Sequence, residues 1–217
     1  MSRIAIIGGH GKVALHLARR LSDKGHAVTS LFRNPDHTAD VEETGAQAVV
    51  ADVENLSTEQ ITDLLRGQDA VVWTAGAGGG APERTFAVDR DAAIRSMDAA
   101  EAAGANRYVM VSYFGAGKNH GVPEDDGFYA YAEAKADADE HLRASSLNWT
   151  ILGPSALTMD PGTGLIETGA GIEGSSVSRE DVAQVAAEVL ERPETAGRTI
   201  EFNNGSTPVA EALDSLA

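Results

Sequence analysis

The sequence of 217 residues contains no cysteine, which excludes disulfide bonds, thiolate metal sites and cysteine nucleophiles. No apolar stretch approaches the roughly 18 residues that a membrane-spanning helix needs. The chain begins with a short apolar segment and lacks the cleavable pattern of a signal peptide. These absences predict a cytoplasmic protein that has no membrane partner.

Basic residues are also scarce, because 17 Lys and Arg stand against 33 Asp and Glu, for a formal net charge of −16. A surface this acidic repels nucleic acid and anionic lipid, so neither is an expected partner. An anionic small molecule would need cations and N–H donors supplied locally. Lys12, Arg33 and Lys135 are therefore of particular interest.

Glycine is concentrated near the N-terminus, directly after an apolar run. Residues 4–7 predict a buried strand, residues 8–11 read Gly-Gly-His-Gly, and residues 12–20 show helical spacing. Strand, glycine turn and helix are the context of a dinucleotide-binding fingerprint, which fits in two registers that both end at Ala14. N–H groups at the helix start would bind a diphosphate. The predicted contacts are Gly8, Gly9, His10, Gly11, Lys12 and Val13.

A second predicted strand, residues 26–33, ends just before Pro35. An NAD site usually has an acidic residue about 20 positions beyond the glycines, where it binds the ribose 2′-hydroxyl. The corresponding window, residues 30–33, contains no acid and ends in Arg33. Because arginine binds phosphate well, we predict NADP rather than NAD. The alternative is a solvated arginine at a strand end.

A third predicted strand, residues 47–51, is followed by Asp52 and Val53. At this strand end Asp52 would accept a hydrogen bond from the adenine amino group, and Val53 would cover the ring. Capping of the next helix, predicted over residues 57–66 with Ser57 as its first cap, is an equal alternative for Asp52.

A fourth predicted strand, residues 69–73, leads into a loop of small residues at 74–80. Small side chains allow a ligand to lie against the backbone, so Ala75, Gly76 and Ala77 are predicted cofactor contacts. A flexible loop without a ligand is the alternative.

The rest of the chain alternates between strand and helix patterns, which predicts an α/β fold. We expect one NAD(P)-binding domain over residues 1–217. Its core would be a Rossmann-type doubly wound parallel sheet with helices on both faces. Glycine-rich residues 155–178 would add a small C-terminal substrate lobe, with short strands near 165–166 and 176–177. The further strands are expected at 107–111, 148–152 and 198–202, and the further helices at 83–103, 128–145, 178–190 and 209–216.

Tyr131 and Lys135 lie four positions apart on the predicted helix 128–145, so they share one face. A lysine ammonium beside a phenol lowers the tyrosine pKa, and such a tyrosine can exchange a proton with a carbonyl or alcohol oxygen. Ser112, at the end of a predicted strand, would bind the same oxygen. The alternative is a packed aromatic ring and a surface lysine.

Together these segments resemble the short-chain dehydrogenase/reductase superfamily, in its atypical branch of NAD(P)H-binding, NmrA-like and epimerase-like proteins. The resemblance covers essentially the whole chain and implies that Tyr131 is the acid/base and that Lys135 binds the nicotinamide ribose. It also implies that nicotinamide lies near Ser112 and the turn that contains Pro154 and Leu157. The sequences that carry it are 4–12, 32–35, 51–53, 109–112, 131–135, 142–154 and 178–183.

The expected function is NADPH-linked reduction of a small carbonyl substrate by a monomer or homodimer. Tyr113 or Tyr129 could replace Tyr131 as the acid. Atypical members of the superfamily often keep the cofactor site with weak activity, so an NADPH-binding redox sensor is the alternative function. Nucleotide-sugar epimerisation or dehydration is a third, which the short C-terminal segment disfavours.

Overall fold

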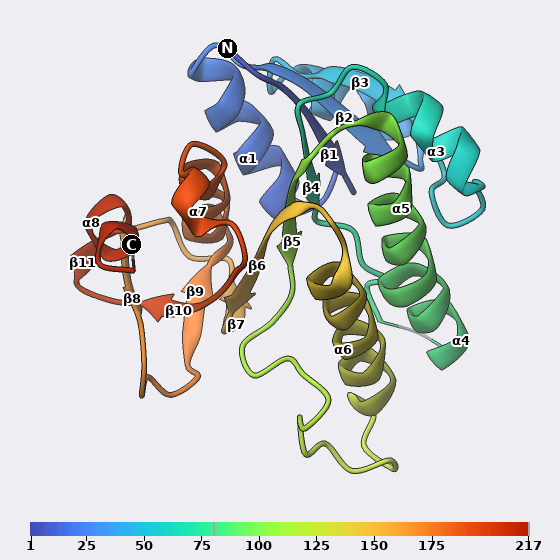
Figure 1. Cartoon of the computed structure of the whole chain (residues 1–217). Helices are drawn as coiled ribbons and strands as arrows, with labels where there is room; N and C mark the ends of the chain where they lie inside the picture. Colours follow the sequence, from blue (N-terminus) through green and yellow to red (C-terminus); the bar gives the residue numbers. More distant parts are fainter. Residues whose placement is uncertain (80, 217) are drawn as a thin grey trace.

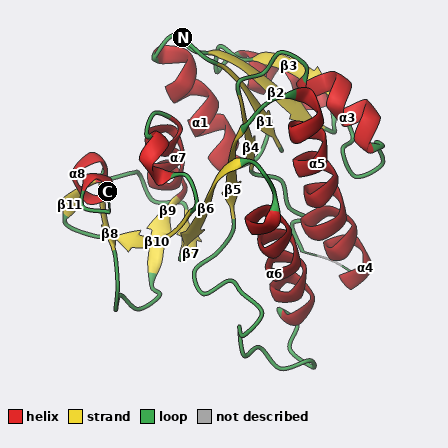
Figure 2. Ribbon diagram, in the orientation of Figure 1, coloured by secondary structure: helices red, strands yellow, loops and turns green. Residues whose placement is uncertain are grey.

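A nine-stranded sheet with helices on both faces forms the centre of the computed structural model, which describes residues 1–79 and 81–216 (Figures 1 and 2). Gly80, at the end of the predicted small-residue loop, lies outside the described residues. No described helix combines the length and apolarity required to cross a membrane.

Seven neighbouring strands of the sheet run parallel, in the order β3-β2-β1-β4-β5-β6-β10. The strand order reverses between β1 and β4, and ligands of doubly wound sheets bind outside the carboxyl ends of the strands at such a point. The predicted Rossmann-type fold is confirmed. The strands are β1 (Arg3–Ile7), β2 (Ala27–Phe32), β3 (Gln47–Val50), β4 (Ala70–Trp73), β5 (Arg107–Val111), β6 (Asn148–Pro154) and β10 (Arg198–Asn204).

Two apolar cores lie on the two faces of the sheet. Because successive side chains of a strand point to opposite faces, Ile4 and Ile6 of β1 enter one core while Ala5 and Ile7 enter the other. The first core contains α1 (Lys12–Asp23) and α7 (Arg179–Leu190), and the second contains α3 (Thr58–Leu65), α5 (Ala93–Ala103) and α6 (Tyr129–Ala144), as Figure 1 shows. Short helices α2 (Thr38–Glu42) and α8 (Val209–Asp214) complete the layers.

Two helix ends carry local capping signals, and Ser57 is the cap that the sequence predicts. Ser57 and Gln60 form a reciprocal capping box at the start of α3, and Gly104 ends α5 in a left-handed conformation with φ 76°. The helix predicted over residues 83–103 is divided into α4 (Pro82–Thr85), a π-helical segment η2 (Phe86–Ala92) and α5.

Residues 155–178 contain three short strands. β7 (Ala156–Thr158) pairs in parallel with β9 (Ser176–Ser178), while β8 (Leu165–Thr168) joins the main sheet between β10 and β11 (Thr207–Pro208). β7 was not predicted, because three residues carry too little pattern to indicate a strand. This pairing holds the segment close to the carboxyl ends of the parallel strands.

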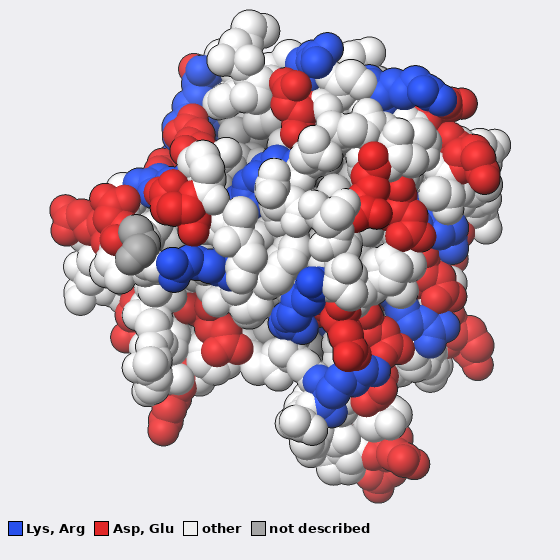
Figure 3. All heavy atoms as spheres, in the orientation of Figure 1, with Lys and Arg blue, Asp and Glu red and all other residues white. Residues whose placement is uncertain are grey.

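The surface carries interspersed charges of both signs, with acidic side chains spread over the face seen in Figure 3. Many basic side chains on the described surface are paired with acids, for example Lys24 with Glu188 and Glu191. Basic side chains that line a cavity are therefore informative about its ligand.

Candidate functional site

Three adjoining cavities follow the carboxyl edge of the sheet. The first, of about 350 Å³, shares Thr74, Ala75 and Gly76 with the second, of about 470 Å³. The second shares Ser112 and Tyr131 with the third, of about 570 Å³. We call this row of adjoining cavities the trough; it begins beside Arg33 and ends among aromatic rings. An extended ligand such as a dinucleotide fits this shape.

The glycine turn forms the floor of the first cavity and is fixed by its own backbone. The N–H groups of Gly8 and Gly9 both donate to the Leu31 carbonyl, at 3.0 and 2.8 Å, and the Gly11 N–H donates to the Gly8 carbonyl at 2.8 Å. Gly8 has φ +89°, and a Cβ there would lie 2.5 Å from the backbone nitrogen of Ala75. Side chains at these positions would therefore close the site.

Helix α1 begins at the end of this turn with free capacity to bind an anion. Gly11 is its N-cap and supplies no capping side chain, and the first turn contains no acid. The first N–H groups of a helix lack partners within the helix and carry the positive end of its dipole. The start of α1 therefore fits a diphosphate, as predicted.

The side chains of His10 and Lys12 contact residues outside the glycine turn. The His10 ring stacks on the His37 ring at 3.5 Å, and its Nε2 lies 2.9 Å from Asp40. The Lys12 ammonium lies 3.5 Å from the sulfur of Met159. Among the described residues that line the three cavities, His10 and Val13 appear but Lys12 does not. The predicted contact of Lys12 with phosphate stays a prediction.

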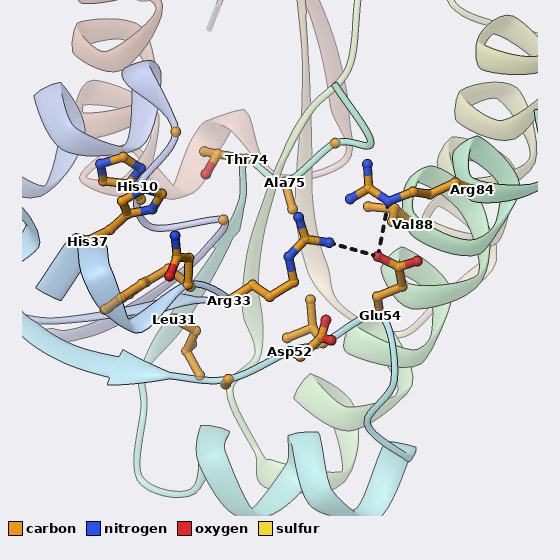
Figure 4. Close-up of a pocket in the computed structure, with 17 residues that line it drawn as sticks. His10, Leu31, Arg33, His37, Asp52, Glu54, Thr74, Ala75, Arg84 and Val88 are labelled. Carbon is orange, nitrogen blue, oxygen red and sulfur yellow. Dashed lines mark hydrogen bonds and ion pairs between the residues drawn. The ribbon is translucent and has the colours of Figure 1, made fainter. Parts of the chain in front are cut away.

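Arg33 lines the first cavity together with a second arginine that the sequence did not reveal. Arg84 comes from α4, and both guanidinium groups lie 3.4 Å from the same oxygen of Glu54, as Figure 4 shows. His37 and Asn34 line the cavity too. No local pattern could have indicated Arg84, because its position depends on the packing of a distant helix.

Asp52 and Val53 line the same cavity, as expected for the adenine end. The Asp52 carboxylate accepts a hydrogen bond of 2.8 Å from the Asn55 amide. Since Ser57 and Gln60 cap the next helix, the capping alternative for Asp52 is wrong.

The loop after β4 is held from both sides. Ala77 donates its N–H to the buried Asp89 carboxylate at 3.0 Å and accepts a hydrogen bond of 2.6 Å from Arg84. Ala75 and Gly76 line the first two cavities and Ala77 lines the second. These residues form an anchored wall where a ligand can lie against the backbone.

Ser112, Tyr131 and Lys135 gather at the far end, but with different contacts from those predicted. The Ser112 hydroxyl donates to Asp139 at 2.6 Å. The Lys135 ammonium, with 1% of the residue exposed, donates to the Val111 carbonyl at 3.0 Å. The surface-lysine alternative is therefore wrong. Burial lowers the pKa of Lys135, which Asp139 and Asp89 partly offset.

The predicted lowering of the Tyr131 pKa is wrong, because burial raises it and Asp89, Asp139 and Tyr113 raise it further. The lysine lies on the same helix face, yet its ammonium is turned towards the β5 backbone. The phenol of Tyr131 therefore stays protonated at neutral pH. It lines both the second and the third cavity.

Three aromatic rings form one side of the third cavity. The ring centroids of Tyr113, Phe128 and Tyr131 lie 5.1 to 5.6 Å apart. Pro154 and Leu157, both predicted, line the same space, and none of its described lining residues is charged. Tyr129 lies outside these linings, with its ring against His120.

Comparison with known proteins agrees with this geometry. Residues 8–193 match the NAD(P)H-binding family. The chain is 35% identical over 216 residues to a Bacillus subtilis protein named uncharacterized sugar epimerase YhfK, covering 99% of this chain and all of that one.

Two solved structures share the fold over nearly the whole chain. A Bacillus halodurans protein, described as an NAD-dependent epimerase/dehydratase, has a TM-score of 0.91 and 33% identity, covering 99% of this chain and 100% of that one. The oxidoreductase ylbE of Lactococcus lactis has a TM-score of 0.86 and 29% identity, covering 99% and 96% of the two chains.

Proposed function

The chain belongs to the NAD(P)H-binding family, and on that premise we propose that it is an NADPH-dependent oxidoreductase that reduces a small, uncharged carbonyl compound. The observation that carries the proposal is the row of three adjoining cavities. It leads from the glycine turn, past the small-residue loop, to an uncharged aromatic cavity with Ser112 and Tyr131 at its entrance.

The residues of the trough fit a nicotinamide dinucleotide. The start of α1 would hold the diphosphate, Asp52 and Val53 the adenine, and Arg33 the 2′-phosphate that favours NADP. The backbone of Ala75 to Ala77 would lie along the nicotinamide half, with Pro154 and Leu157 closing it from the other side. When bound, the nicotinamide supplies the hydride.

Tyr131 is the proposed proton donor for the carbonyl oxygen. Its raised pKa keeps the phenol protonated, which suits reduction rather than abstraction of a proton from an alcohol. Phe128 and Tyr113 pack beside its ring and limit the access of water. Lys135 would add a buried positive charge and would hold the end of β5 through the Val111 carbonyl. It would not lower the Tyr131 pKa.

Ser112 is the proposed group that orients the carbonyl oxygen. The protonation state of Asp139 decides whether the Ser112 hydroxyl can donate a hydrogen bond to it. When the carboxyl is ionised, the serine proton lies on that bond and the serine oxygen can only accept. Burial raises the pKa of Asp139, and a protonated carboxyl would free the serine hydroxyl to donate to a carbonyl oxygen.

The uncharged third cavity argues against nucleotide-sugar chemistry in this chain. A nucleoside diphosphate carries negative charges that need cations or N–H donors when it leaves water. The described lining of this cavity contains neither lysine nor arginine. An uncharged carbonyl compound with an apolar or aromatic body fits better.

The test is a panel of aldehydes, ketones and quinones, with a nucleoside diphosphate sugar as comparison, followed by NADPH absorbance. We expect consumption with uncharged carbonyls only. In Tyr131→Phe, kcat should fall by roughly 10²- to 10⁴-fold, the usual contribution of a positioned acid, with NADPH affinity retained. Tyr129→Phe is the matched control and should behave like the parent.

Two results would contradict this proposal. Full turnover by Tyr131→Phe would remove that residue from the reaction. Tight NADPH binding without consumption by any carbonyl would favour the redox sensor instead.

A further inference from the structure

Glu54 lines the cavity at the predicted adenosine end. Its Oε2 lies 3.4 Å from Nη1 of Arg33 and 3.4 Å from Nε of Arg84, so one oxygen faces two cations (Figure 4). The three side chains come from the end of β2, the segment after β3 and helix α4. No pair of them is close in sequence.

The backbone that carries Glu54 is held in place by a further arginine. Arg95 of α5 donates to the carbonyl oxygens of Glu54 at 2.9 Å, Val53 at 3.3 Å and Leu56 at 3.1 Å. The Glu54 side chain is 22% exposed, compared with 59% for Arg33 and 37% for Arg84. The carboxylate is thus the fixed and shielded member of the cluster, and the arginines are its more exposed partners.

The two cations have different freedom to move. Arg84 is fixed at one nitrogen, which donates to the Ala77 carbonyl at 2.6 Å, so its guanidinium stays beside the cavity. Arg33 follows the end of β2, and its guanidinium contacts the Glu54 carboxylate. A phosphate with three terminal oxygens can accept charge-assisted hydrogen bonds from both guanidinium groups at once, and a neutral hydroxyl gains much less from the same two cations.

We propose that Glu54 is the residue that sets the choice between NADPH and NADH, by competing with the 2′-phosphate for Arg33 and Arg84 and by accepting a hydrogen bond from an unphosphorylated 2′-hydroxyl. A 2′-phosphate must take both arginines from the carboxylate and remain close to its negative charge. A ribose hydroxyl instead donates to Glu54 and leaves the cluster intact. The acid that the end of β2 lacks is thus supplied from the segment after β3.

This inference rests on the proposed position of the adenosine half in the first cavity, but it does not depend on any reaction. Its probes are therefore fragments without nicotinamide. Adenosine 2′,5′-bisphosphate carries the 2′-phosphate, and adenosine 5′-monophosphate carries the free 2′-hydroxyl. Calorimetric titration of both gives their Kd values for the parent and for each variant.

In Glu54→Gln we expect the bisphosphate to bind roughly 3- to 10-fold more tightly, because a like charge near the phosphate is removed. The monophosphate should bind about 3- to 10-fold more weakly, since a hydrogen bond to a charged group becomes a neutral one. In Arg84→Ala the bisphosphate should lose affinity while the monophosphate loses little. The affinity for NADPH should change in the same direction as that for the bisphosphate, and the affinity for NADH in the same direction as that for the monophosphate.

Glu140→Gln is the control, because it makes the same change of charge at an exposed position of α6. It should leave both Kd values unchanged. Far-ultraviolet circular dichroism checks folding, and Glu54→Asp provides a second variant that keeps the charge but shortens its reach.

Equal Kd shifts for the two fragments in Glu54→Gln, or none, would overturn the role of Glu54. If neither fragment binds the parent while NADPH does, the assignment of the adenosine half to this cavity is wrong. If the ratio shifts as expected but no carbonyl is reduced, the proposed reaction fails and the selectivity role stands.

Discussion

The Ser112 hydroxyl donates a hydrogen bond of 2.6 Å to Oδ2 of Asp139, a carboxyl group that is 0% exposed. The other oxygen of that carboxyl is buried without a hydrogen-bond partner among the described residues. Lys135, four positions earlier on the same helix, is the stronger of two nearby cations that favour its ionised form, and Arg143 is the other. The charge state of the buried Asp139 carboxyl therefore decides where the Ser112 proton lies.

Asp139→Ala should lower kcat by roughly 10- to 100-fold, because the Ser112 hydroxyl loses the partner that holds it in position at the reacting centre. Ser112→Ala should lower it by a similar factor. Because both variants break the same bond, the double variant should be little slower than either single one. Fully additive losses would show that the two residues act separately. NADPH affinity, measured by titration, serves as the check that the fold is retained.

The pH profile of reduction tests the direction of the Tyr131 pKa. A phenol donates its proton only below its pKa, and burial with nearby acidic groups raises that pKa above its usual value near 10. Ionisation of Tyr131 should therefore cause no loss of kcat/KM between pH 7 and about 9.5. An alkaline limb below pH 9 that disappears in Tyr131→Phe would instead indicate a lowered pKa.

Gly9→Ala should destabilise the fold by about 1–3 kcal/mol and weaken NADPH binding, because the added Cβ would overpack the buried wall behind the turn. It would lie 2.6 Å from the Cβ of Ser30, which is fully buried. Gly117→Ala is the matched control, since a Cβ there meets nothing within 4 Å. Thermal melts with and without NADPH measure both effects. Parent-like melting of Gly9→Ala with and without NADPH would contradict the packing argument.

Arg107 links β5 to β6 and to the end of α7 on the edge opposite the trough. It donates to the carbonyls of Asn148 at 2.6 Å and Val189 at 2.8 Å, and to the hydroxyls of Thr150 at 2.8 Å and Thr195 at 3.0 Å. Burial lowers the pKa of Arg107 to about 10. Keeping its charge inside the protein therefore costs free energy, although neutral oxygens accept from it.

Arg107→Ala should lower the free energy of unfolding by about 2–4 kcal/mol, because several buried acceptors lose their donor. Arg107→Lys should recover little of this, since one ammonium cannot reach acceptors on three elements. Arg66→Ala, which breaks an exposed ion pair with Asp63, should change it by less than about 1 kcal/mol. Urea unfolding measures the stability of all three variants. Full recovery of stability in Arg107→Lys would contradict the need for the several donors of a guanidinium group.

Most of the fold was predictable from local patterns, because strands such as β1 and β4 are short apolar runs and helices such as α3 and α7 begin at capping serines. The glycine turn was predictable for the same reason, since its chemistry lies in consecutive residues. The short strand β7 was missed because its three residues carry too little pattern and its partner, β9, is distant in sequence.

The residues at the far end of the site were predicted from the sequence, but the contacts that they make were not. The four-residue spacing of Tyr131 and Lys135 indicates a shared helix face, yet it does not reveal that the ammonium turns to the Val111 carbonyl. Asp139, Arg84 and Glu54 carried no local signal, because each acquires its partner only when separate elements pack. The sequence therefore indicates the backbone part of the site better than its charged side chains.

The doubly occupied carbonyl of Leu31 has a consequence for binding entropy. This carbonyl accepts hydrogen bonds from the N–H groups of Gly8 and Gly9, and Gly11 donates to the Gly8 carbonyl. All three bonds join only atoms of the protein. The turn already has its shape, so a ligand does not have to order it, and the entropy of loop ordering is not subtracted from the affinity. Association at this end should then proceed as a single step, as expected for a rigid receptor.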